Sequence, residues 1–222
     1  MTRTRPTAAS LLLLALLPFS AARAQAIDYA IDPVHTRIAF LVSHAGFSRA
    51  LGTFSGSHGT LRFDPDNWPA AKVDVTIPIA SLDLGDAHWG KKVLDGSFFD
   101  VEKFPTAHFV STRVEPVAAA EGAAVGSSHA RVYGKLSLHG QQQEVVLDVQ
   151  LNALKRQPLP PFHRSAGFSA TATLSRKAFG VTAWPDMIGD AVELRIEAEA
   201  EAVRTDAQPA TPPAPTQDAA QP

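Results

Sequence analysis

The sequence predicts an all-β domain, an antiparallel sandwich or barrel of about eight strands. Most of the chain alternates apolar and polar residues with a period of two, as in "KVDVTIPI" and "VELRIEAEAEA". Such alternation indicates strands with one apolar and one solvated face. The strands follow one another without a convincing alternation of strand and helix. Cysteine is absent from all 222 residues, so a hydrophobic core rather than disulfides must stabilise the fold.

The first 24 residues have the pattern of a secretory signal peptide. Arg3 and Arg5 precede the apolar run "LLLLALLPF", and "ARA" offers a small-residue cleavage site at residues 22–24. The run is shorter than the roughly 20 apolar residues that span a bilayer, so we expect a mature protein without stable membrane insertion. An uncleaved signal anchor is the alternative. Export without disulfides favours a periplasmic location.

Cleavage there removes three arginines and no acid, which moves the formal charge from −2 to −5. The remaining Lys and Arg residues are scattered. Nucleic-acid partners are bound through clustered positive charge, so this composition argues against one.

Eight runs have the apolar spacing of a strand. They span residues 38–42, 61–63, 73–79, 106–116, 132–138, 145–151, 168–174 and 192–198. The last run is rich in helix formers, but its strict alternation favours a strand. "LHGQQQEVV" predicts a hairpin that turns at Gly140. Residues 84–96 break the alternation and predict a short helical segment.

Two segments look unlike packed structure. The end from Thr205, "TDAQPATPPAPTQDAAQP", has no aromatic or large aliphatic residue and predicts a disordered tail over residues 205–222. Residues 115–129 predict a long hairpin loop, because strand patterns resume directly after them. The domain boundaries are therefore a signal peptide at 1–24, a β-barrel domain at 25–204 and the tail.

The candidate catalytic and metal-binding residues form no motif. The eight histidines show no H-x-H or H-E-x-x-H spacing, and no G-x-S-x-G elbow is present. We therefore predict no catalytic residue and no metal ligand, and expect a structural hydrogen bond between Asp32 and His35. Two rival functions stay open: a lipid-modifying enzyme with polar residues inside the barrel, and a periplasmic protein that binds metal through histidines from several strands.

The apolar face mixes large and small side chains. Phe40, Phe54, Phe109 and Phe168 occur among residues as small as Gly134. A barrel of about eight strands is either filled by its own side chains or left open for one small ligand. Composition alone favours the filled core.

Several separated motifs resemble the YceI-like, polyisoprenoid-binding family. They are "YAIDPVHTRIAFLVSHAGFSRALGTFSGSHGTLRFD" from Tyr29, "SFFDVEKFPTAHF" from Ser97, "GKLSLHGQQQEVVLDV", "LSRKAFGV" and "IGDAVELRIEAEA". The resemblance covers residues 27–202 in order. It implies an extended, lipocalin-like antiparallel β-barrel that holds a long isoprenoid or similar amphiphile in an apolar tunnel, without catalysis.

The resemblance and the alternation together give a set of expected binding residues. We expect the tunnel to be lined by Ile38, Phe40, Val42, Phe54, Phe98, Phe99, Phe109, Leu136, Phe168, Leu174 and Phe179. We expect a polar mouth made of His44, Ser48, Arg49 and Arg176. The expected ligand is a quinone or polyprenyl lipid, with no other cofactor. Monomer and homodimer both stay open.

Overall fold

The computed structural model describes residues 26–117 and 128–203. The predicted signal peptide, the predicted tail and most of the predicted 115–129 loop lie outside these residues. The described chain contains ten strands, one α-helix and three 3-10 turns. The strands are β1 (Ile27–Ile31), β2 (Arg37–His44), β3 (Ser48–Phe54), β4 (His58–Phe63), β5 (Lys72–Pro78), β6 (Thr106–Val117), β7 (Ser128–Leu138), β8 (Gln141–Arg156), β9 (Arg164–Ser175) and β10 (Ile188–Ala202). The helical elements are η1 (Trp68–Ala70), η2 (Ile79–Ser81), α1 (Ala87–Leu94) and η3 (Lys177–Phe179).

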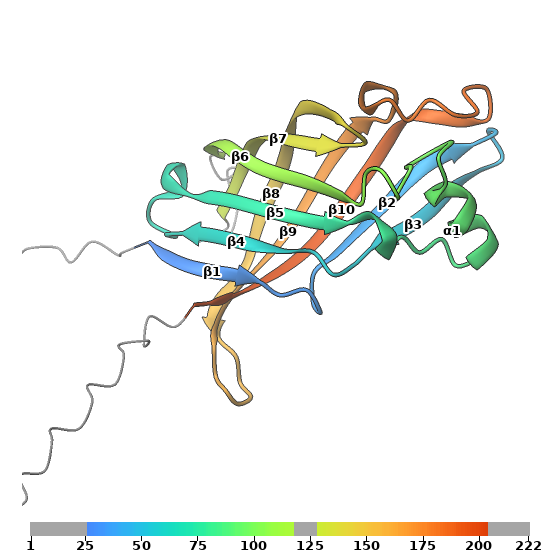
Figure 1. Ribbon diagram of the computed structural model, residues 1–222. Coiled ribbons are helices and arrows are strands. Elements are labelled where there is room, and N and C mark those ends of the chain that lie inside the picture. The colour runs from blue at the N-terminus through green and yellow to red at the C-terminus, as the bar shows by residue number, and fades with distance from the viewer. Residues whose placement is uncertain (1–25, 118–127, 204–222) are drawn as a thin grey trace, which may run out of the picture.

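Eight of the ten described strands close into an antiparallel barrel (Figure 1). Their order around the ring is β1-β4-β5-β6-β7-β8-β9-β10, and β10 returns to pair with β1. The remaining strands, β2 and β3, form a hairpin that extends the sheet beyond β10. The predicted all-β barrel of about eight strands is thus confirmed.

Strand β10 changes partner along one of its edges. Its first part pairs with β2, from Ile188 opposite His44 to Glu197 opposite Arg37, and its end pairs with β1. Glu199 lies at the change. The Thr36 hydroxyl donates to the Glu199 carbonyl and accepts from the Glu199 N–H, both at 3.3 Å. The Asp32 N–H also donates to the Glu199 carbonyl, at 2.9 Å. Thr36 and Asp32 therefore satisfy the Glu199 backbone between the two pairings.

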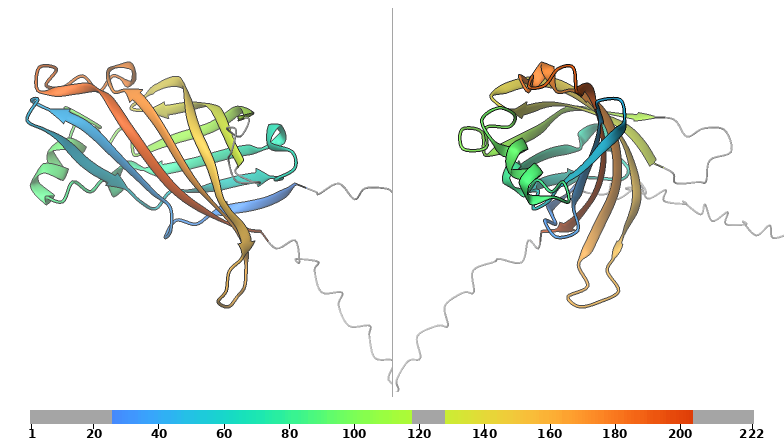
Figure 2. Two further views of the ribbon diagram at one scale, coloured as in Figure 1. Left: turned by 180° about the vertical axis from the view of Figure 1, so that it is seen from behind. Right: turned by 90° about the vertical axis from the view of Figure 1, so that its right-hand side faces the viewer.

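Helix α1 lies across the end of the barrel where the β2–β3 hairpin projects, as the right-hand view of Figure 2 shows. The Asp86 carboxylate caps its first turn by accepting from the Trp89 N–H at 2.7 Å. The free edge of β3 is held nearby, because Thr53 pairs with Asp83 in an isolated bridge. We call this end of the barrel, with α1 and the β2–β3 and β9–β10 turns, the helix end.

The individual element predictions compare well with the structure. The expected helical segment at 84–96 contains α1, and the last alternating run is β10. The predicted hairpin turns at His139 and Gly140, which have φ values of 51° and 74°, as a two-residue turn between β7 and β8 requires. Two short strands, β1 and β3, were not among the eight predicted runs.

Candidate ligand-binding cavities

Two apolar cavities lie inside the barrel. The first, which we call the barrel cavity, has a volume of about 190 Å³ and is walled by strands of the closed ring, by η1 and by Ile38 of β2. The second, the helix-end cavity, has a volume of about 200 Å³ and is walled by β2, β3 and α1 as well. Both share five lining residues: Ile38, Ile77, Leu136, Leu174 and Leu194. The cavities therefore adjoin along the barrel.

The alternation of the strands produces these walls. In β10 the even positions from Val192 to Ala198 line the cavities, while Glu193, Arg195 and Glu197 are exposed. The barrel cavity has only two polar lining residues, Thr36 and Ser57. Apolar cavities of about 150 Å³ stay dry and bind apolar guests in other proteins, so these spaces suit hydrocarbon.

The structure places all eleven expected tunnel residues on the cavity walls. The barrel cavity takes Phe109 and Phe168, and the helix-end cavity takes Phe40, Val42, Phe54, Phe98, Phe99 and Phe179. The other three, Ile38, Leu136 and Leu174, line both cavities.

Small residues leave room for the aromatic rings in the wall. A Cβ atom on Gly134 would lie 2.4 Å from the Phe109 ring, and one on Gly52 would lie 2.4 Å from the Phe40 ring. Phe40 in turn packs on Phe54, with ring centroids 5.6 Å apart. The mixture of large and small side chains therefore seats the rings against the sheet, and the two cavities remain beside them.

The sequence analysis missed several lining residues, most of them outside the strands. Trp68 of η1 is buried and lines the barrel cavity. Trp89 and Val93, one helical turn apart on α1, line the helix-end cavity together with Val181 and Ile188. A period of two cannot identify residues in turns and helices. The i, i+4 spacing of Trp89 and Val93 was the signal available in the sequence.

Arg176 occupies a different position from a solvent-facing mouth residue. It lines the helix-end cavity but is only 7% exposed. Its guanidinium donates to the carbonyls of Gly189, Val181, Ala183 and Ile188 at 2.7–2.9 Å. Burial lowers the pKa of Arg176 from its ordinary value, while the nearby Asp190 acts in the opposite direction. Four of its five N–H groups thus hold the β9–β10 turn in place.

The other three expected mouth residues lie around the helix end. His44 ends β2, and its ring packs edge-on against Trp89 with centroids 6.0 Å apart. Ser48 is exposed opposite His44 at the start of β3. Arg49 points to the outer face of the sheet, where it forms an ion pair with Glu193. None of the three lines either described cavity, so their role at the mouth stays a prediction.

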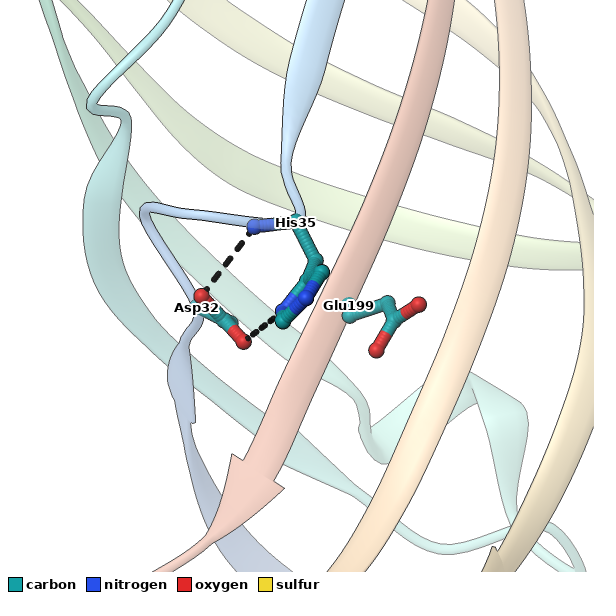
Figure 3. Close-up of side chains that lie close together, drawn as sticks. All are labelled: Asp32, His35 and Glu199. Carbon is teal, nitrogen blue, oxygen red and sulfur yellow. Dashed lines mark hydrogen bonds and ion pairs between the residues drawn. The ribbon is translucent and has the colours of Figure 1, made fainter. Parts of the chain in front are cut away.

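Asp32 and His35 form the expected structural hydrogen bond (Figure 3). The His35 Nδ1 lies 2.6 Å from Asp32 Oδ2, and Asp32 Oδ1 accepts from the Val34 and His35 N–H groups. Burial alone would raise the pKa of Asp32, but its hydrogen bonds to His35 and the turn lower that pKa overall. The same pair raises the pKa of the exposed His35. Both oxygens of Asp32 therefore serve the turn between β1 and β2.

Glu199 completes a group of three side chains with these two residues. Their ligand atoms lie within 4.8 Å of one another, the one such group found among the described residues. A metal bound by Asp32 Oδ2 and His35 Nδ1 would replace the hydrogen bond between these two atoms. The turn accounts for the Asp32 and His35 side chains, and the Glu199 backbone bonds to Thr36 and Asp32 at the barrel closure.

A closed antiparallel barrel with an apolar interior defines the class of this protein as a lipocalin-like barrel. The YceI-like domain model matches residues 29–200. The chain therefore belongs to the YceI-like family.

Curated relatives and solved structures agree with this assignment. A UPF0312 protein of Pseudomonas savastanoi pv. phaseolicola is 36% identical over 164 residues, which cover 73% of this chain and 80% of the relative. BcnA of Burkholderia cenocepacia superposes with a TM-score of 0.65 at 22% identity, over 76% of this chain and 98% of BcnA. A polyisoprenoid binding domain of Saccharophagus degradans, implicated in plant cell wall breakdown, superposes with a TM-score of 0.60 at 14% identity, over 80% of this chain and 99% of that domain. At these identities the two structures show the shared fold.

Within the described residues, no helix is long and apolar enough to cross a membrane.

Proposed function

We propose that this protein holds a long isoprenoid, a quinone or a polyprenyl lipid, or a similar long-chain amphiphile in its two adjoining cavities. It stores or transports this ligand in the periplasm and performs no chemistry on it. The observation that carries the proposal is the pair of apolar cavities with five shared lining residues inside the closed barrel. Membership of the YceI-like family supports it, as does the fold shared with a polyisoprenoid binding domain.

The hydrophobic effect is sufficient to hold such a ligand against water. Burial of each CH₂ group contributes about 0.8 kcal/mol, so a five-carbon unit contributes up to roughly 3–4 kcal/mol. A few units approach the practical ceiling near 20 kcal/mol, and the ordering of the chain reduces this gain. Retention in water therefore needs no polar contact with the ligand.

Exchange with a membrane depends on different contacts. A bilayer is already apolar, so the hydrophobic gain nearly cancels when the chain moves between bilayer and protein. Contacts with the head group must then decide which amphiphile is held. Arg176 is the charged residue that lines the helix-end cavity, and one of its N–H groups has no described acceptor. We assign the head group to this end, with His44 and Trp89 beside it.

The identity of the ligand tests the proposal directly. Native mass spectrometry of protein purified from its own periplasm should show an added mass in the range of a long-chain amphiphile, and organic extraction should release it. A homogeneous ligand-free mass, together with no uptake of added lipid, would contradict the proposal. An enzyme would instead form product from a lipid extract, and a metal-binding protein would show stoichiometric metal by elemental analysis.

A further inference from the structure

Three apolar side chains project from the helix end into solvent. Phe47, in the β2–β3 turn, is 92% exposed, and Trp184 and Met187, in the β9–β10 turn, are 53% and 41% exposed. Trp89 of α1 is 37% exposed. We call these four residues the tip patch. Exposed aromatic residues gathered at one end of a molecule mark an interaction surface.

Contacts between the segments hold the tip patch together. The Ala45 N–H donates to the Met187 carbonyl, and Ile188 pairs with His44 across the β10–β2 ladder. The His44 ring in turn packs on Trp89. The two turns and α1 therefore present one surface, which lies away from the described chain ends in Figure 1 and in the left-hand view of Figure 2.

The tip patch is continuous with the helix-end cavity. Trp89 belongs to both, because it is partly exposed and lines the cavity. Ile188, which follows Met187, also lines the cavity, as does Val181 at the start of the same turn. An acyl or isoprenoid chain leaving the cavity at this end would meet apolar side chains before it met bulk water.

The charge and the exposed area of the tip patch indicate which kind of partner binds it. Residues 45–47 and 181–187 contain one charged side chain, Asp186, so the two turns offer no positive charge to an anionic surface. Helix α1, which carries Trp89, has the exposed Lys91 and Lys92, and Lys92 pairs with Asp95. Aromatic side chains expose roughly 200 Å² when free, so the four partly exposed residues supply about half of the ~800 Å² per partner that a stable protein interface buries. Projecting turns tipped with Trp and Phe instead match the interfacial region of a bilayer, where such side chains concentrate.

We propose that the tip patch docks onto a zwitterionic lipid bilayer, so that the ligand passes between the membrane and the helix-end cavity without crossing water. This inference rests on the proposed function, which supplies the ligand that is transferred. The docking itself is a property of the ligand-free protein. Ligand transfer should therefore occur by collision with the membrane and not by release into solution.

Co-sedimentation with phosphatidylcholine vesicles tests the docking. We expect Phe47→Ser combined with Trp184→Ser to lower the vesicle partition coefficient about tenfold or more, since membrane binding scales with the apolar area inserted. The matched control combines Leu159→Ser with Phe162→Ser. These residues are 71% and 50% exposed on the β8–β9 loop, away from the helix end, and their substitution should leave partitioning unchanged.

Transfer kinetics test the route. Protein loaded with a fluorescent hexadecanoate should deliver it to vesicles at a rate that rises with vesicle concentration, and the Phe47→Ser, Trp184→Ser variant should lose this dependence. If the probe is retained but its transfer rate does not depend on vesicle concentration, the docking inference is overturned and the proposed function stands. If no long-chain probe is retained, the proposed function is wrong. The co-sedimentation experiment still tests the docking in that case, because it uses the ligand-free protein.

Three further results would overturn the inference. They are equal losses of partitioning in the tip-patch and control variants, binding that requires phosphatidylglycerol, and a lipid-free dimer that the tip-patch substitutions abolish. Circular dichroism of both variants shows that the fold is intact. All four substituted side chains are at least half exposed, so we expect unchanged spectra.

Discussion

The two cavities share five residues but are built in different ways. The barrel cavity is enclosed by hydrogen-bonded strands and by Trp68 of η1. The helix-end cavity depends on α1, on Phe179 of η3 and on the β9–β10 turn that Arg176 fixes. A wall of paired strands resists local opening, whereas short helices and turns open more easily. The helix-end cavity should therefore open more readily than the barrel cavity.

The largest expected effect is at Arg176. Arg176→Ala leaves four backbone carbonyls of the β9–β10 turn without their charged donor. We expect a loss of about 3–4 kcal/mol in the free energy of unfolding, measured by urea denaturation. Hydrogen exchange should increase in residues 181–189 before the rest of the barrel. Equal protection of this turn in variant and wild type would show that the turn does not depend on Arg176.

Glycine substitutions compare how rigid the two cavity walls are. A Cβ on Gly134 meets the Phe109 ring and, at 2.7 Å, the Val110 backbone oxygen, whereas the three atoms nearest to one on Gly52 all belong to the side chains of Phe40 and Leu84. We expect Gly134→Ala to lower the free energy of unfolding by about 2–3 kcal/mol and Gly52→Ala to lower it by about 1 kcal/mol. Backbone atoms in a paired strand move less easily than side chains do.

The control for these two variants is Gly167→Ala. A Cβ there meets nothing within 4 Å, so its melting temperature should stay close to that of the wild type. A larger loss for Gly52→Ala than for Gly134→Ala would reverse the ranking of the two walls.

Filling each cavity separately tests whether one ligand occupies both. Ala170→Phe places a ring in the barrel cavity, and Ala50→Phe places one in the helix-end cavity. For a ligand that spans both, each variant should weaken retention of a C18 probe about tenfold, the loss of roughly two buried CH₂ groups. Weaker retention in only one variant would show that the ligand occupies only the cavity filled in that variant. A C8 probe should distinguish the variants, because it needs only one cavity.

The smallest effect concerns pH. Asp32 raises the pKa of His35 above 6.5, so the stability contributed by this group is full below about 6.5 and is lost as the pH rises through the folded value. The lowered pKa of Asp32 adds stability that is lost as the pH falls below 3.8. The melting temperature of the wild type should therefore decline slightly above neutral pH, and His35→Ala should remove that decline. An identical pH profile in both proteins would show that the pair is energetically silent.

The strand pattern predicted much of the fold and of the cavity walls. Val192, Leu194 and Ile196 alternate with acids and arginine, and this order alone assigns them to the inner face. Residues such as Trp89 and Val181 could not be found in this way, because their segments have no period of two. Short β1 was missed for a related reason, since five residues offer too few alternations to detect.

The mouth residues show the limit of sequence position. His44, Arg49 and Arg176 all follow or end apolar runs, which suggested similar roles. The structure directs Arg49 outward to Glu193 and turns Arg176 inward onto four carbonyls. The acceptors of Arg176 lie on residues 181–189, and those of Arg49 lie on β10, so neither partner is visible in local sequence.

By itself, the sequence determined the all-β class, the inward face of each long strand and the family resemblance, because these depend on local alternation and on the order of motifs. Only the tertiary structure decided that the sheet closes through β10 onto β1, that the β2–β3 hairpin and α1 extend one end, and that open space remains beside the aromatic rings. Barrel closure and cavity volume depend on contacts between residues that are distant in sequence, so no local sequence pattern predicts them.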